Sequence, residues 1–155
     1  VPGSTQPTVC IINLISPSKY SEKRFARLVE RLLRYRIGVI VCPSAALSMR
    51  QIRSIEAPAY NSIARVNELI KMKVPLRLGT DNIADTFVPQ GDGDMLTEIK
   101  MGGVAVRLNP PAIWAKLASG HPLNNADIAT VGRYLHQDRL AWGQHAPADW
   151  EPAVQ

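Results

Sequence analysis

The sequence has little of several features that define common protein classes. It has two cysteines, Cys10 and Cys42, which lie in apolar runs and lack the spacing of a metal site. Aromatic residues make up 6% of the chain, and no apolar run approaches the length of a membrane span. These scarcities argue against a cysteine-based metal site and a membrane-spanning helix. They predict buried, reduced thiols.

The amino-terminal residues show no recognisable targeting signal. Residues 1–14 do not have the pattern of a signal peptide. Unpaired cysteines together with this pattern predict a cytoplasmic protein. The first residue is Val1 rather than Met, and we therefore expect a processed chain or a piece of a longer one.

Positive charge is concentrated in one segment. The chain carries a formal net charge of +5, and much of it comes from residues 19–36. The segment lacks interleaved aromatic residues and any nucleic-acid-binding motif, so we interpret it as the solvated face of a helix. We expect neither nucleic acid nor a membrane as a partner. The basic residues are Lys19, Lys23, Arg24, Arg27, Arg31, Arg34 and Arg36.

Three short apolar runs predict β-strands. Residues 9–15 are apolar except for Asn13, which is typical of a strand in a parallel sheet covered on both faces. Residues 39–42 form the second run, and residues 74–80, which surround Pro75, form the third. Each run ends in small or polar residues, as strands commonly do.

Amphipathic helices separate these strands. Apolar residues between the first two strands recur at helical spacing from Phe25 to Leu33, with Ser21 as the expected N-cap. A second helical pattern runs from Ile63 to Ile70, preceded by an irregular connection at residues 45–57 that holds Arg50 and Arg53. Strands alternating with helices predict parallel pairing with right-handed crossovers.

Only helices are expected after the third strand. Asp94 is the predicted cap of a helix over residues 95–108, in which Gly102-Gly103 allow close packing. A helix after Asn109 ends at Gly120, and a last helix runs from Asn124 or Asn125 to Gln137. We therefore predict one unit over residues 1–137 and an irregular tail over residues 138–155. Three parallel strands form an incomplete sheet, so the chain resembles part of a larger fold.

Asp81 is the first candidate functional residue. It follows the third predicted strand, and the carboxyl ends of parallel strands are where α/β proteins bind ligands and metals. The structural alternative is that Asp81 caps a turn or the start of a helix.

Two motifs resemble a known family. The stretch Cys42-Pro-Ser-Ala-Ala-Leu-Ser48 and the longer stretch Gly79-Thr-Asp-Asn-Ile-Ala-Asp-Thr-Phe-Val-Pro-Gln-Gly-Asp-Gly-Asp-Met-Leu96 resemble the metal-dependent amidohydrolase superfamily. The resemblance covers residues 9–108 and is nearest to cytosine deaminase and to the N-ethylammeline and isopropylammelide hydrolases. It implies an α/β fold, namely a partial (β/α)8 TIM-type barrel holding about the last three βα units, followed by C-terminal helices.

The resemblance also implies a chemistry. In this family a divalent metal, zinc or iron, acidifies a bound water, which attacks a ring carbon or an amide carbonyl and expels an amine. Asp81 resembles the carboxylate that binds the metal and takes the proton from the water. Asn13, Ser44 and Phe87 would line the substrate pocket. For Phe87 the alternative is a hydrophobic anchor of its loop.

The chain departs from the family pattern in several places. The resemblance begins at the sixth barrel strand, so the family's metal-binding histidines after strands one and five have no counterpart here. Asn13 stands where the family has a histidine, and Asn cannot accept a proton at neutral pH. His121, His136 and His145 match no family ligand, and we interpret them as surface or helix-end residues. The small β-sandwich that usually closes the family's chain has no counterpart after Gln137.

These observations predict a fragment or subunit of a cytosine-deaminase-like amidohydrolase that is inactive alone. The complete enzyme would hydrolyse C–N bonds of ring amines or cyclic amides, with an N-terminal half-barrel chain as partner. The alternative is a non-catalytic half-barrel remnant that forms a homo-oligomer through its sheet edges. A third interpretation, a nucleic-acid-binding module on residues 19–36, predicts steeply salt-dependent binding.

Overall fold

The computed structural model describes residues 7, 9–48 and 63–145, with only the backbone for residues 138–145. Arg50 and Arg53 of the expected irregular connection lie outside the described residues. None of the described helices is both long and apolar enough to cross a membrane.

A three-stranded parallel sheet organises the fold. Its strands are β1 (Val9–Ile12), β2 (Ile37–Val41) and β3 (Leu76–Leu78), in the order β1-β2-β3. Val9 pairs with Ile37, and Val39 pairs with Leu76. The predicted strands and their parallel pairing are therefore confirmed, although β1 and β3 are shorter than the apolar runs that predicted them.

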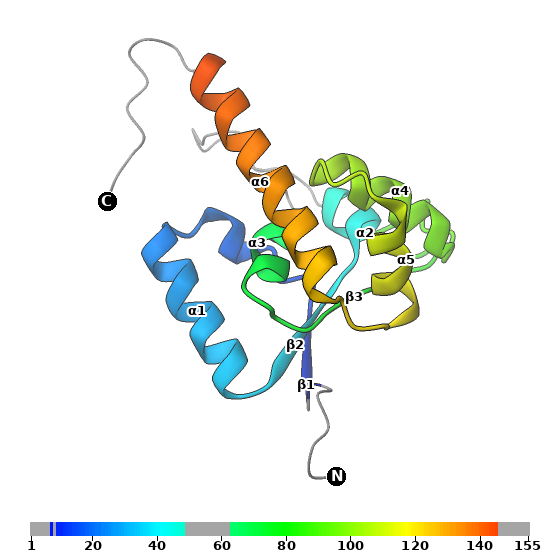
Figure 1. The fold of residues 1–155 in the computed structure, drawn as a ribbon. Helices are drawn as coiled ribbons and strands as arrows, with labels where there is room; N and C mark the ends of the chain where they lie inside the picture. Colours follow the sequence, from blue (N-terminus) through cyan, green and yellow to red (C-terminus); the bar gives the residue numbers. More distant parts are fainter. Residues whose placement is uncertain (1–6, 8, 49–62, 146–155) are drawn as a thin grey trace, which may run out of the picture.

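Helices follow each strand, as the sequence predicts. They are the 3-10 helix η1 (Ser16–Lys19), α1 (Glu22–Arg34), α2 (Pro43–Ser48), α3 (Val66–Lys71), α4 (Met95–Ala105), α5 (Pro111–Ser119) and α6 (Asn125–His145). In Figure 1, α1 lies to the left of the strands, α2, α4 and α5 lie to the right, and α3 and α6 lie in front.

Local caps explain where several helices begin and end. The hydroxyl of Ser21 accepts a hydrogen bond from the Arg24 amide at 3.4 Å, and Asp94 accepts one from the Leu96 amide at 2.8 Å. Gly120 ends α5 with a φ of 72°, in the left-handed region that glycine adopts without strain. All three caps were predicted from the sequence.

Two expectations about the helices are wrong. The connection expected to be irregular from Ala45 begins instead with α2, where Pro43 occupies the first turn and needs no hydrogen-bond partner for its nitrogen. The last helix continues from Gln137 to His145, so the irregular tail does not begin at residue 138. The helix continues through Gly132 and Gly143, because an isolated glycine only weakens a helix and no proline lies between residues 125 and 145.

The helices cover one face of the sheet. Val39 and Val41 of β2 and Leu78 of β3 are buried on this face, because paired residues of adjacent strands point the same way. Helical residues complete the core, and burial of this apolar surface stabilises the fold. They include Phe25, Val29, Leu32, Leu69, Ile70, Trp114, Leu117 and Val131.

The opposite face and the β1 edge are open among the described residues. Ile12, Ile40 and Arg77 form one cross-strand row on this face; Ile12 is 56% exposed and Arg77 is also exposed. On the β1 edge Val9 is 60% exposed. The expectation that β1 is covered on both faces is therefore wrong. The exposed apolar side chains of β1 have no covering element on this face among the described residues.

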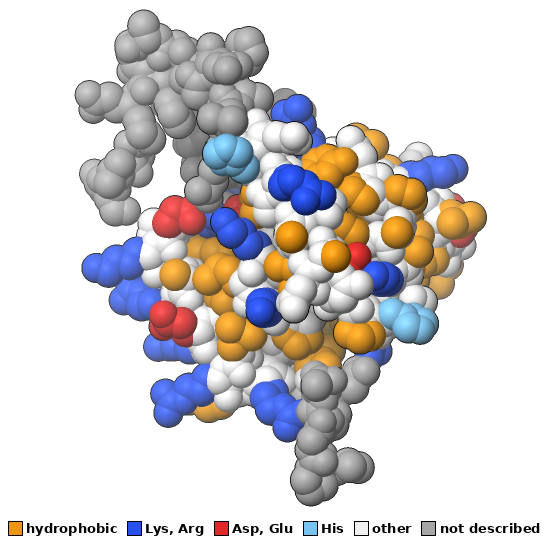
Figure 2. All heavy atoms as spheres, in the orientation of Figure 1, with side chains coloured by type: hydrophobic (Ala, Val, Ile, Leu, Met, Phe, Trp, Pro, Cys, Tyr) orange, Lys and Arg blue, Asp and Glu red, His pale blue; other side chains and the backbone are white. Residues whose placement is uncertain are grey.

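The basic segment is a solvated helix face, as predicted. Lys23, Arg24, Arg27, Arg31 and Arg34 of α1 are all exposed. Figure 2 shows Lys and Arg side chains gathered over the side of the molecule where Figure 1 places α1. The opposite stripe of α1, which includes Phe25 and Leu32, packs into the core.

Gly102 lets α4 approach α5 closely. A Cβ atom at this position would lie 2.6 Å from Cη2 of Trp114, whose ring is buried and whose indole N–H donates to the Leu108 carbonyl at 2.6 Å. The indole cannot move away without losing that bond. The close packing expected from Gly102-Gly103 is thus confirmed at Gly102.

We predict that Gly102→Ala destabilises the fold by about 1–3 kcal/mol, because the added methyl group overpacks the contact with Trp114. Gly132→Ala is the matched control, since a Cβ at that helical position meets nothing within 4 Å and alanine favours a helix by about 1 kcal/mol. Urea unfolding of both variants gives the two free energies. Equal stability of the two variants would contradict the packing argument.

Candidate functional site

The three strands carry polar residues at their carboxyl ends. Asn13 follows β1 directly, Cys42 follows β2, and Asp81 comes shortly after β3. Because the strands are parallel, these ends meet at one edge of the sheet. Gly79 makes room for the turn after β3, since a Cβ there would lie 2.8 Å from Cγ2 of Ile40.

Asn13 and Asp81 are joined directly. The amide Nδ2 of Asn13 donates to Oδ2 of Asp81 at 2.8 Å. The two residues come from strands on either side of β2, so the bond passes over the end of the central strand. The structure therefore brings together two of the four site residues predicted from the sequence.

Both residues of this pair have a left-handed backbone conformation. Asn13 has a φ of 68° and Asp81 a φ of 58°, a left-handed conformation that Asn and Asp tolerate better than other side chains. Leu14 has a φ of 44°, which costs about 1–2 kcal/mol for a non-glycine residue. Such strained residues cluster at functional sites, where the surrounding structure holds them.

Asn13 also has an unused acceptor. Its Oδ1 atom is buried and has no hydrogen-bond partner among the described residues. An unsatisfied buried carbonyl costs about 1–3 kcal/mol, so the site favours a group that can donate to it. Asp81 likewise presents carboxylate oxygens, and both groups would accept from a bound water or an N–H group.

Ser44 is held by a carboxylate that the sequence analysis missed. Both its amide, at 2.9 Å, and its hydroxyl donate to the side chain of Glu98 on α4. Glu98 is only 2% exposed. A glutamate in the first turn of a helix is usually explained by the helix dipole, so the sequence carried no signal for this contact. Because the Ser44 hydroxyl donates its proton to Glu98, the Ser44 oxygen can act only as an acceptor toward another group.

Cys42 lies close to both carboxylates. Burial is the main cause of a raised thiol pKa, and together with the negative charges of Asp81 and Glu98 it brings that pKa to about 12. The thiol therefore stays neutral at physiological pH. Both cysteines are free, Cys42 buried as predicted and Cys10 only partly so.

The loop after Asp81 is organised by a different aspartate. Asp85 accepts from the amides of Phe87 and Val88 at 2.9 and 2.8 Å and from the side chain of Asn82. The Val88 amide is the main cause of a lowered pKa for Asp85, with Asn82 and Phe87 contributing. Asp85, rather than Asp81, thus fills the capping role that was the structural alternative for Asp81.

Phe87 does not anchor this loop. Its side chain is 82% exposed, so the alternative that treats it as a hydrophobic anchor is wrong. Val88 is buried instead, against Cys42 and Ala45. The proposed contact of Phe87 with a substrate stays a prediction.

The histidines lie away from the site. His121 and His136 are exposed, and Nδ1 of His121 is 2.7 Å from the Ser119 hydroxyl at the end of α5. His145 ends α6, as expected of a helix-end residue. Across the described side chains, no three His, Cys, Asp or Glu residues come together as a metal site.

By itself, the candidate site with Asn13, Ser44 and Asp81 can orient a carboxylate and accept hydrogen bonds.

Comparison with known proteins shows similarity in fold. No family model and no curated protein sequence matches the chain. Solved structures do match, among them the 5-methylcytosine deaminase from Klebsiella pneumoniae liganded with 5-fluorocytosine and the same protein liganded with phosphonocytosine. Each has a TM-score of 0.64 and 18% sequence identity, over 83% of this chain and 30% of that chain. The chain thus spans less than a third of that deaminase and has the fold of part of it.

We predict that Asp81→Asn lowers the pKa of the Cys42 thiol, because it removes a negative charge that opposes the thiolate. In a Cys10→Ser background, alkylation of Cys42 by iodoacetamide would be followed by mass spectrometry as a function of pH. In the Asp81→Asn variant, the alkylation rate should begin to increase at a lower pH than it does in the parent protein. Asp92→Asn is the control, since Asp92 is not among the charges that raise this pKa. The same pH profile in the Asp81→Asn and Asp92→Asn variants would contradict the closeness of Asp81 to Cys42.

Proposed function

We propose that this chain is part of a metal-dependent amidohydrolase of the cytosine deaminase type, which hydrolyses C–N bonds in ring amines or cyclic amides. The observation that carries the proposal is the hydrogen bond between Asn13 and Asp81 across the strand ends. The fold shared with part of a 5-methylcytosine deaminase supports it.

In this proposal Asp81 is the catalytic carboxylate. One oxygen accepts from Asn13, and the other is left to hold a water and take its proton. Asn13 positions Asp81 and offers Oδ1 to an N–H group of the substrate. Ser44 accepts a second N–H group, and Phe87 provides an apolar wall. The acceptors at this end of the sheet suit a substrate rich in N–H donors.

The metal implied by the family resemblance needs more than this chain. A zinc or iron site takes about three or four protein ligands, and the described residues bring no three His, Cys, Asp or Glu side chains together. The described residues alone do not form a metal site. When bound in the complete enzyme, the metal would make its water more acidic. We therefore propose that the chain by itself is inactive.

An N-terminal half-barrel is the proposed partner, either as a separate chain or as a preceding segment. The open face with Ile12 and Arg77 and the exposed edge of β1 support this, because a parallel sheet is normally covered on both faces. The coverage of 30% of the deaminase is consistent with a missing remainder. We also propose a cytoplasmic location, supported by the two free cysteines.

A denaturing mass spectrum of the protein purified from its source tests this partnership. A companion chain of roughly 20–30 kDa, or a longer single chain, would support it, since a complete barrel needs about 250 residues. A single species at 17.0 kDa would contradict it.

We predict that Asp81→Asn in the complete protein lowers kcat for cytosine or 5-methylcytosine deamination by about 10²–10⁴-fold, since the amide cannot take a proton. Ammonia release measures the rate. Asp92→Asn removes a carboxylate from the same loop and should leave the rate unchanged. Full activity of the Asp81→Asn variant, or metal-dependent deamination by the isolated chain, would overturn the proposal.

A second candidate is a non-catalytic remnant that self-associates through β1. The exposure of Val9 and Ile12 on an edge strand favours it, because exposed edges template pairing with another chain.

If this second candidate is right, the isolated chain forms a dimer that Ile12→Lys disrupts, since charge on an edge strand opposes pairing. Light scattering after size exclusion measures the mass. Val104→Lys, at an exposed apolar position of α4, is the control and should leave the dimer intact. A monomeric wild-type chain would rule this candidate out.

A further inference from the structure

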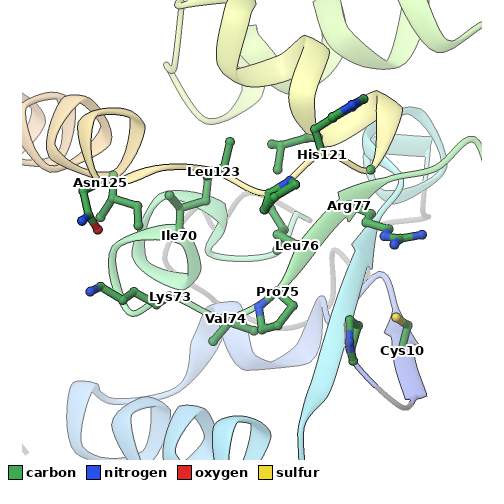
Figure 3. A pocket seen from close by; sticks show the side chains of 15 residues that line it. Cys10, Ile70, Lys73, Val74, Pro75, Leu76, Arg77, His121, Leu123 and Asn125 are labelled. Atoms are coloured by element: carbon green, nitrogen blue, oxygen red, sulfur yellow. The ribbon is translucent and has the colours of Figure 1, made fainter. Parts of the chain in front are cut away.

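A pocket lies at the end of the sheet opposite to Asp81. It is bounded by Pro75 and Leu76 at the amino end of β3 and by Cys10 near the start of β1 (Figure 3). Asp81 comes after the carboxyl end of β3, so a ligand in this pocket would not reach it. The pocket is therefore separate from the candidate site described above.

The floor of the pocket is apolar and belongs to the core. Ile70 of α3 and Leu117 of α5 are buried, and Ile128 of α6 and Leu123 complete the lining from the other side. The cavity is about 290 Å³. This is about twice the roughly 150 Å³ engineered cavity that holds benzene, so a two-ring aromatic body fits by volume. Small-molecule sites typically have such a mainly apolar lining with few polar groups.

Among the described residues, the ionisable side chains of the lining include basic groups and no carboxylate. Lys73, Arg77 and His121 line the pocket, and none of its described lining residues is Asp or Glu. Figure 3 shows Lys73 and Asn125 at one end and Arg77 at the other. Arg77 lies against Gly120 at the carboxyl end of α5, with its Cζ 3.4 Å from where a Cβ of Gly120 would be. The Lys73 ammonium makes no ion pair within the described part of the chain.

We propose that this pocket binds a small amphipathic anion, with an apolar body of one or two rings over Ile70 and Leu117 and a carboxylate beside Lys73 and Asn125. The absence of acidic groups in the lining means that an anion meets no repulsion there. Asn125 can donate a second hydrogen bond to the carboxylate. The proposal does not depend on the amidohydrolase function, because the two sites lie at opposite ends of the strands.

The probe is 2-naphthoate, with 2-naphthamide as its neutral counterpart of the same shape. Both are titrated into the isotope-labelled full chain and followed by amide chemical shifts. We expect 2-naphthoate to bind with a dissociation constant of about 1 mM, typical for a ligand of about thirteen heavy atoms. Its shifts should map to the α3–β3 and α5–α6 turns. 2-Naphthamide should bind about threefold more weakly, the effect of one exposed ion pair.

Two pairs of variants test the two parts of the site. Lys73→Gln should remove the difference between the two probes, whereas Lys71→Gln, on the exposed side of α3, should keep it. Lys73→Gly gives a folded control that lacks the charge, because Lys73 has a φ of 61° that glycine adopts without strain. Ile128→Trp should fill the pocket and abolish binding, whereas Ala129→Trp on the exposed side of α6 should not.

Three results would overturn the proposal: no binding of 2-naphthoate, shifts that map to the open face around Ile12, or unchanged binding by a folded Ile128→Trp variant. Equal affinity for 2-naphthoate and 2-naphthamide would overturn the anionic part. None of these outcomes bears on Asp81, so failure here is distinct from failure of the proposed deaminase function.

Discussion

The parallel pairing of three strands is the constraint on which the rest of the structure depends. Parallel strands need a crossover between each pair, and α1 and the α2–α3 segment supply these crossovers. The same pairing places the loops after all three strands at one edge of the sheet. It therefore brings Asn13 and Asp81 together, although they are far apart in the sequence. It also places the apolar pocket at the other edge.

The sheet is covered unequally, and this asymmetry shapes any account of function. Burial on the helical face stabilises the fold, with Val39 and Val41 fully inside the core. On the other face Ile12 and Arg77 meet solvent. An apolar strand with an open edge is a surface that natural proteins usually cover. Both candidate functions, a completed barrel and a self-associated remnant, are ways to cover this surface.

The site contains more acceptors than donors. Asp81 accepts from Asn13, Glu98 accepts from Ser44, and Oδ1 of Asn13 has no partner among the described residues. Burial raises the pKa of the Cys42 thiol and keeps it neutral, and the two nearby carboxylates act in the same direction because each opposes a further negative charge. Such an environment favours a ligand that brings N–H groups or a positive charge, and this preference follows from the hydrogen bonds alone.

The sequence by itself determined the strands, most of the helices, their caps at Ser21, Asp94 and Gly120, and the position of Asp81 after the third strand. These depend on short-range patterns of apolar spacing and capping that each segment carries. Only the tertiary structure decided that Glu98 holds Ser44, that Phe87 is exposed, that α2 forms and α6 continues to His145, and that β1 lies open. Burial and contact depend on which elements pack together. An apolar strand therefore has the same sequence pattern whether or not a neighbour covers it.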